Sequence, residues 1–266
     1  MDAASFVGFI GCWVACAIGI VTATGGNIAP YLDLPSVFIT ILGSFFATML
    51  CYPMEMTTKG LPQATKYVFF TPQLDTAGTI RTIVEFSQKA RREGLLALEA
   101  EAEQLANPFL KKGLRLVVDG TDPELVRSIL EIEMQYMDER HKGIVGYYFM
   151  WGSLAPAFGM IGTLIGLVGM LLSLGSGSVE DLGPSMAAAL ITTLYGTLMA
   201  NIFLNPFATK LSGLNADELL LNELILEGIL SMQAGENPRI IEEKLLVFLS
   251  GEARNSLTNS QYGEES

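Results

Sequence analysis

Four stretches of apolar residues dominate the hydrophobic pattern of this chain, and each approaches the roughly 20 residues that an α-helix needs to cross a bilayer. They run from about Ser5 to Thr24, Leu34 to Tyr52, Ile144 to Leu174 and Leu182 to Phe207. None contains Asp, Glu, Lys or Arg, and the connections Gly25–Asp33 and Gly175–Asp181 are short and turn-like. The pattern predicts an all-α integral membrane protein with four transmembrane helices.

Helical periodicity also marks the polar segments. Ile80, Ile83 and Val84 recur with helical spacing between the second and third apolar stretches. The sequence Thr121-Asp122-Pro123-Glu124 is a helix start, a cap followed by proline, and the helix that it opens is positioned to run straight into the third span. We expect a helical cytoplasmic domain between spans two and three, and a further short helix beginning at Asn237-Pro238.

The chain therefore divides into five segments. These are residues 1–53 with transmembrane helices 1 and 2, 54–143 with the helical cytoplasmic domain, 144–207 with transmembrane helices 3 and 4, 208–250 with a helical cytoplasmic tail, and 251–266, a polar and disordered C-terminus.

The basic residues predict the orientation. All 16 Lys and Arg residues lie between Met54 and Gly143 or after Phe207, and the two short loops have none. The positive-inside rule places the large loop and the tail in the cytoplasm, and four spans then place the N-terminus there as well. The first residues lack a basic region and a cleavage site, so we expect the first apolar stretch to be a retained helix.

Composition supports the membrane class and excludes nucleic acid as a partner. Only 17% of the residues are charged, against about 25% in a typical soluble domain. The net charge of −12 is unsuited to binding phosphates. Cys12, Cys16 and Cys51 lie in apolar surroundings without metal-ligand spacing, and we interpret them as packing residues.

The four spans contain no ionisable Asp, Glu, Lys or Arg, although proteins that move ions through a membrane usually keep such a residue at bilayer depth. If this protein conducts ions, a partner must supply the titrating group. The sequence also offers no nucleophile–base pair, no phosphate-binding loop and no metal cluster, so we expect neither an enzyme nor a cofactor. The single histidine, His141, is interpreted as a solvated or capping residue.

Small residues line one face of the third span. Gly159, Gly162, Gly166 and Gly169 allow another helix to approach closely. The fourth span carries a matching small face that includes Ala188 and Gly196. Two interpretations remain open: packing between these spans within one chain, or packing against a partner helix in an oligomer.

Hydroxyl groups in these two spans are candidates for an ion path. They belong to Thr163, Thr192, Thr193 and Tyr195. Oxygen ligands suit a hard cation such as sodium, and Thr163 and Thr193 are the strongest candidates. The alternative is that each threonine bonds back to a carbonyl of its own helix.

Two prolines are candidate hinges. Pro156 and Pro206 lie near the cytoplasmic ends of spans three and four, where a missing N–H frees a carbonyl one turn earlier and permits a kink. They either couple the membrane to the cytoplasmic domain or only shape the helix ends. We also interpret Ala90–Glu99 as one charged helix with a solvated face.

Several segments, in this order, resemble one family, the MotA/PomA subunits of bacterial flagellar stators in the MotA/TolQ/ExbB proton channel superfamily. They are ARREGLLALE from Ala90, NPFLKKGLRLVVDG from Asn107, DERH from Asp138, LAPAFGMIGTLIGLVGML from Leu154, LGPSMAAALITTLYGTLMAN from Leu182 and GENPRIIEEKL from Gly235. The resemblance covers roughly residues 1 to 250.

The resemblance implies a function and partners. Five such subunits surround two copies of a single-span partner, MotB or PomB, which carries the titrating Asp, in the bacterial inner membrane. Passage of sodium or protons then drives torque on the rotor protein FliG. By motif, Arg91 and Glu99 correspond to the rotor-facing residues, and Pro156 and Pro206 to the functional prolines. Thr163 and Thr193 resemble the sodium-driven members.

Other classes fit less well. ExbB/TolQ proteins, which energise outer-membrane processes, are the nearest alternative, but they have three spans and lack the second span seen here. A secondary transporter predicts a midplane charge or inverted repeats, and neither is present.

Overall fold

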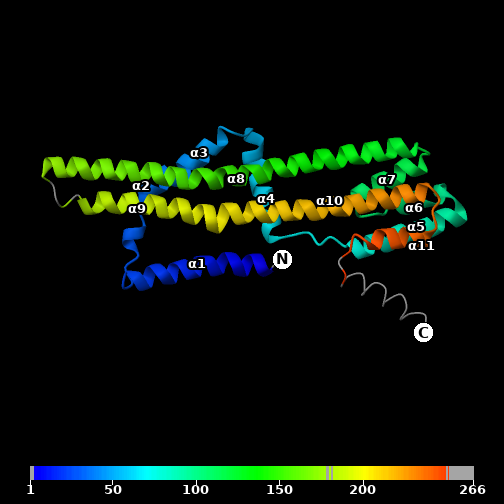
Figure 1. Ribbon diagram of the computed structural model, residues 1–266, viewed down its shortest axis with the longest axis horizontal. Helices are drawn as coiled ribbons and strands as arrows, with labels where there is room; N and C mark the ends of the chain where they lie inside the picture. Colours follow the sequence, from blue (N-terminus) through cyan, green and yellow to red (C-terminus); the bar gives the residue numbers. More distant parts are fainter. Residues whose placement is uncertain (1–2, 178–179, 181, 250, 252–266) are drawn as a thin grey trace. The chain divides into compact units, whose positions relative to one another are not determined.

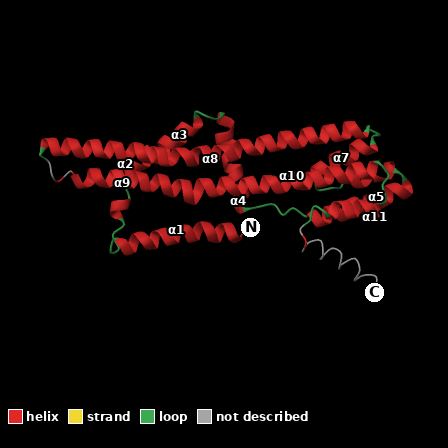
Figure 2. Ribbon diagram, viewed as in Figure 1, coloured by secondary structure: helices red, strands yellow, loops and turns green. Residues whose placement is uncertain are grey.

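The computed structural model describes residues 3–177, 180, 182–249 and 251, and within these residues every regular element is helical. Figures 1 and 2 show the helices and their connecting loops. The chain forms two compact units. Residues 1–72 and 141–213 make up the first, here called the membrane unit, and residues 73–140 and 214–266 the second, the polar unit. The prediction of an all-α protein is confirmed.

The first two spans of the membrane unit are α1, Ala3–Ala23, and a composite helix. The composite helix consists of α2, Leu34–Ser36, a π-helical segment, Val37–Leu42, and α3, Gly43–Met49. Asp33 caps its start by accepting a hydrogen bond of 2.9 Å from the backbone N–H of Ser36. A second π-helical segment, Met56–Gly60, then leads into α4, Leu61–Phe69.

The other two spans belong to helices that continue beyond the apolar stretches. α8 runs for 54 residues, Pro123–Ser176, so the helix that starts at Pro123 enters the third span without a break. The fourth span comprises α9, Leu182–Leu198, a π-helical segment, Met199–Leu204, and the start of α10, Asn205–Gln233. The four predicted transmembrane helices are thus all present.

The polar unit is built from short amphipathic helices around the ends of α8 and α10. Its own helices are α5, Thr76–Glu93; α6, Glu99–Ala102; α7, Pro108–Val118; and α11, Pro238–Leu246. A single apolar core joins them, and its fully buried members include Ile83, Leu98, Leu114, Leu130, Leu224, Ile229 and Ile241. Asn107 and Asn237 cap α7 and α11, at the starts that the Asn-Pro pairs predict.

The prediction of one continuous helix over Ala90–Glu99 is wrong. α5 ends at Glu93, and Gly94 has a φ of +87°, which side-chain-bearing residues rarely adopt. A 3₁₀ turn, Leu95–Leu98, follows, and Leu98 inserts into the core. The chain therefore changes direction between Arg91 and Glu99.

The boundaries of the two units differ in place from the predicted segments. The membrane unit extends to Pro72 and therefore includes α4, and its second part covers residues 141–213. Of the predicted disordered C-terminus, 251–266, all residues except Gly251 lie outside the described part of the chain.

Candidate functional site

The glycine face of α8 packs against α9 of the same chain. A Cβ atom added at Gly159 would lie 3.0 Å from the carbonyl oxygen of Thr192, and one at Gly166 would lie 2.7 Å from the Cβ of Ala189. Gly162 faces the side chain of Thr192 in the same way, and Gly169 lies beside Ser185. Of the two interpretations of the small faces, the structure has packing within the chain, because α9 occupies the space that the missing side chains leave.

Pro156 lies in the interior of α8, next to a close approach of α9. A Cβ atom at Gly196 would lie 2.5 Å from the carbonyl oxygen of Ala155 and 3.0 Å from the Cα of Pro156. Because Pro156 has no N–H, the carbonyl of Gly152 loses its donor within the helix. A helix irregularity and a close interhelical contact therefore coincide here.

Pro206 is the second residue of α10 and directly follows the π-helical segment Met199–Leu204. Proline cannot donate to the carbonyl of Ile202, four residues earlier, so the local hydrogen-bond register is free to widen. At both predicted hinges, therefore, a helical carbonyl lacks the donor that proline cannot supply.

Thr163 and Thr193 lie on facing helices at neighbouring levels. The Cα of Thr193 would lie 3.1 Å from a Cβ at Gly159, one turn before Thr163 on α8. The hydroxyl of Thr163 is exposed and donates to the carbonyl of Met160 at 2.6 Å. That of Thr193 is half-buried and donates across the interface to the carbonyl of Gly159 at 3.5 Å.

Thr192 is only 1% exposed, and its hydroxyl bonds to carbonyls of its own helix, at 2.9 Å from that of Ala189. Its own carbonyl accepts a 3.3 Å hydrogen bond from the hydroxyl of Thr40 in the second span. These contacts assign Thr192 to the junction of three helices.

Tyr195 reaches the loop before the second span. Its hydroxyl donates to the carbonyl of Tyr31 and accepts from the backbone N–H of Asp33 at 3.3 Å. Because Asp33 also caps α2, Tyr195 ties the fourth span to the start of the second.

The second span contains a buried row of hydroxyls that the sequence analysis does not single out. Ser36, Thr40, Ser44 and Thr48 follow one another at four-residue intervals, and all have no exposed surface. Thr40 bonds to α9, and Ser44 accepts from the indole N–H of Trp151 at 3.1 Å. The four-residue spacing of small hydroxyl residues was the available signal.

In the polar unit, Arg91 and Glu99 are exposed, and within the described part of the chain neither has an ion-pair partner. Neighbouring charges are paired instead. Lys89 contacts Glu101 at 2.5 Å, and Glu103 contacts Lys111 at 3.0 Å as well as Arg115. The chain leaves these two charges available while neutralising several around them.

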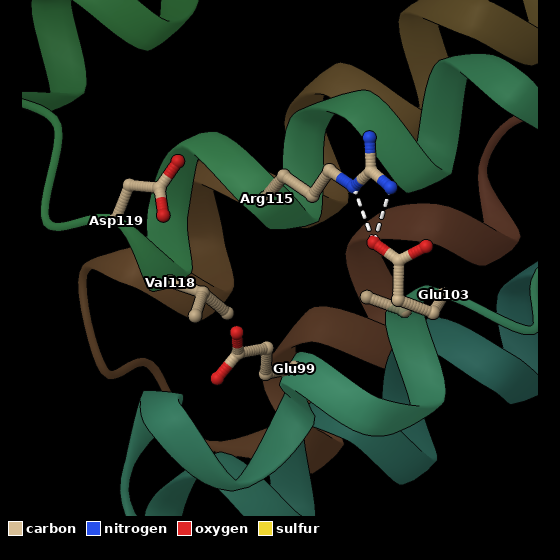
Figure 3. Close-up of a pocket in the computed structure, with 6 residues that line it drawn as sticks. Glu99, Glu103, Arg115, Val118 and Asp119 are labelled. Carbon is tan, nitrogen blue, oxygen red and sulfur yellow. Dashed lines mark hydrogen bonds and ion pairs between the residues drawn. The ribbon is translucent and has the colours of Figure 1, made fainter.

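Figure 3 shows a shallow groove between α6 and α7, lined by Glu99, Ala102, Glu103, Arg115, Val118 and Asp119. The Arg115 guanidinium forks onto Glu103, with Nε donating to Oε1 at 2.6 Å. The carboxylates of Glu99 and Asp119 point into the groove without such a partner in this view.

These ion pairs shift the pKa values of the side chains that form them. Hydrogen bonds from Arg115 and then Lys111 hold the pKa of Glu103 below its usual value of 4.5. The hydrogen bond to Glu101 raises the pKa of Lys89 above 10.5. These charges are therefore held in place by one another at neutral pH.

Comparison with known proteins gives one consistent result. Residues 101–223 match the MotA/TolQ/ExbB proton channel family. Motility protein A of Borreliella burgdorferi is 45% identical over 99% of this chain and 100% of its own length. Chemotaxis protein PomA of Vibrio alginolyticus is 38% identical over 94% of this chain and 96% of its own length.

Solved structures agree. The flagellar MotAB stator complex from Bacillus subtilis contains a chain that matches with a TM-score of 0.85 at 34% identity, covering 95% of this chain and 98% of that one. The C. jejuni MotAB structure matches with a TM-score of 0.86 at 28% identity, covering 94% and 97%.

Proposed function

This chain belongs to the motility protein A subunits of the MotA/TolQ/ExbB proton channel family, and from this membership we propose how it works as a flagellar stator subunit. Such a subunit couples cation flow across the membrane to torque on the rotor. The observation that carries the mechanism is the lack of Asp, Glu, Lys and Arg in all four apolar stretches. A MotB-like single-span partner supplies the titrating carboxylate, and the two together form the ion path. The ExbB/TolQ alternative is not favoured, because motility proteins match over nearly the whole chain.

The membrane is the bacterial cytoplasmic membrane, with both termini on the cytoplasmic side. The distribution of Lys and Arg supports this orientation, because the short loops carry none.

Five copies surround two partner chains in this proposal. The small face of α8 is used by α9, so its opposite side is available for neighbours or for the partner. There Met160, Leu164, Leu167 and Leu171 form a stripe with helical spacing, and their exposed fractions range from 43% to 64%. An apolar stripe of this length supports helix contacts within a ring.

Arg91 and Glu99 contact the rotor in this proposal. A charged side chain that already has a partner must lose it before it binds another protein, and these two have no such cost. Their exposure on either side of the Gly94 turn supports contact with a charged surface of the rotor protein FliG.

Sodium is the proposed coupling ion, with protons as the alternative. The Thr163 hydroxyl donates a hydrogen bond to the carbonyl of Met160. The lone pairs of the hydroxyl oxygen therefore stay free to coordinate a cation. The Thr193 hydroxyl lies one turn away along the same interface. Pro156 and Pro206, at irregular points of α8 and α10, are the proposed hinges.

The test is the swimming speed of a stator-null strain that expresses this chain with its cognate partner, measured while sodium is varied at fixed pH. We expect speed to rise and saturate with sodium, and Thr163→Ala to shift the half-saturating concentration upward several-fold. Full speed without sodium, abolished by a protonophore, would instead identify a proton stator and remove the ligand role of Thr163. No motility with well-expressed protein would contradict the stator function itself.

A further inference from the structure

α4, Leu61–Phe69, is an amphipathic helix held firmly against the spans of the membrane unit. Its residues Ala64 and Val68 are buried. The hydroxyl of Thr65 lies 2.7 Å from that of Tyr148, which also donates to the carbonyl of Leu61 at 3.3 Å. These contacts define which face of α4 points inward.

The same contacts define the depth of α4 relative to the apolar stretches. Tyr148 is about one turn inside the start of the third stretch at Ile144, and the ring of Phe69 lies 5.4 Å from that of Phe207, at the end of the fourth. Phe69 also contacts Phe6, near the start of the first, at 4.9 Å. α4 therefore lies where the apolar parts of three spans end, at the edge of the hydrocarbon layer.

The outer face of this helix combines positive charge with aromatic rings. Gln63, Lys66 and Tyr67 share that face, and Phe70 directly follows the end of the helix. Tyr67 and Phe70 are 43% and 51% exposed. Among the residues that the structure describes, Lys66 has no ion-pair partner. Lys59, one to two turns earlier, is 77% exposed and pairs only with Glu55, at 2.9 Å on its own helix. An exposed ion pair of this kind contributes little to stability, so the Lys59 ammonium group can leave Glu55 for another anion.

We propose that this face, made by Lys59, Gln63, Lys66, Tyr67 and Phe70, binds the anionic headgroups of the adjacent phospholipid leaflet. The aromatic rings lie at headgroup depth, where amphipathic aromatic residues are preferred, and the two ammonium groups contact lipid phosphates. The position of α4 favours lipid over a second copy of this chain, because its contacts with Phe6, Tyr148 and Phe207 place it where the apolar stretches end, and phospholipid headgroups lie at that depth. The bound lipid anchors α4 and, through Tyr148 and Phe207, the inner ends of the spans. The inference does not depend on the coupling ion.

The experiment uses the complete complex with its partner, reconstituted in nanodiscs that contain equal amounts of phosphatidylglycerol and phosphatidylcholine. The complex is then extracted in detergent, and the lipids that stay bound are quantified by mass spectrometry. We expect the wild type to retain phosphatidylglycerol preferentially. Lys59→Gln and Lys66→Gln should each lower that preference by about fivefold, which corresponds to the ~1 kcal/mol of a basic residue near an anionic surface. The double variant Lys59→Gln/Lys66→Gln, which removes two charges, should lower it further.

Two controls separate local binding from net charge. The double variant Arg81→Gln/Lys112→Gln removes the same charge from the polar unit and should leave the preference unchanged. Lys59→Arg/Lys66→Arg keeps the charge and should keep the preference. If Lys59→Gln/Lys66→Gln impairs assembly, the single Lys66→Gln variant is measured instead.

Three results would overturn the proposal. They are an unchanged preference in the Lys→Gln variants, an equal loss in the Arg81→Gln/Lys112→Gln control, and loss of neighbouring subunits without loss of lipid, which would assign the face to protein contact. Motility in the strain that tests the stator function is read separately, so failure of one proposal is distinguishable from failure of the other.

Discussion

At the scale of single residues, ion pairing separates the charged side chains of the polar unit into two kinds. Some are bound to a partner within the chain, and others are exposed and able to bind another protein. Glu103 accepts hydrogen bonds from Arg115 and pairs with Lys111, which joins the end of α6 to α7. Glu99, four residues earlier, has no partner among the described residues. Both are acidic residues of one short segment, and only the folded arrangement of α7 separates their roles.

The pairing of Glu103 predicts a pH-dependent contribution to stability. Its pKa is lower in the folded than in the unfolded protein, so the stabilisation is fully present above the unfolded value near 4.5 and is lost as pH falls through the folded value. Glu103→Gln should therefore lower the thermal unfolding midpoint at pH 7, and the difference from wild type should shrink as pH falls below 4.5. Glu124→Gln, an exposed change at the start of α8, serves as the control. A midpoint difference that persists at low pH would show that Glu103 acts by packing and not by charge.

At the scale of elements, the contact of α8 with α9 depends on glycine. The helices are close enough that the backbone of one lies where a side chain of the other would be. Small residues permit this approach. Lipid tails are as apolar as the helix surfaces, so the hydrophobic effect does not hold the two helices together, and van der Waals contacts between closely packed helices do so instead. Thr40 and the buried hydroxyl row add the second span to the same assembly.

Gly166→Ala tests this contact. The added Cβ would lie 2.7 Å from the carbonyl oxygen of Ser185 and from the Cβ of Ala189, so we expect destabilisation of about 1–3 kcal/mol. The measurement is the unfolding midpoint of the complex in detergent.

Gly175→Ala on the same helix is the matched control, because an added Cβ there has no heavy atom within 4 Å. It should be neutral or slightly stabilising, since alanine is the better helix former. Equal stability of the two variants would mean that the helices separate readily at Gly166.

At the scale of the whole molecule, the proposed mechanism requires that events in the membrane unit reach the charges of Arg91 and Glu99 in the polar unit. α8 and α10 are the continuous helices that pass from one unit to the other along the chain. Pro156 and Pro206 each remove a backbone hydrogen bond from these helices. We therefore expect the helices to bend most readily at these two positions.

Charge reversal at Arg91 and Glu99, the residues proposed to contact the rotor, is the corresponding test. Arg91→Glu or Glu99→Arg should reduce swimming speed up to several-fold, because single exposed charge pairs contribute about 0–1 kcal/mol each. Membrane levels of the protein and the mass of its complex with the partner should stay unchanged. Arg81→Glu, on the exposed surface of α5, should swim normally. Loss of motility that accompanies loss of the protein would remove the rotor-contact role.

The sequence by itself determined the four spans, the helix starts at Asn107, Pro123 and Asn237, and the absence of Asp, Glu, Lys and Arg from the apolar stretches. These properties follow from hydropathy, capping residues and charge, which are local along the chain. The break at Gly94 could also be suspected from glycine, but the apolar spacing around it favoured one continuous helix.

Only the tertiary structure decided which surfaces are used within the chain and which remain available. Gly159 and Gly166 fit a neighbouring helix in one chain or in another, and spacing cannot distinguish these cases. Arg91 and Lys89 are both basic residues of α5, but only Lys89 meets a carboxylate, because α6 places Glu101 beside it. Contacts between residues far apart in the sequence make these decisions, and no local pattern encodes them.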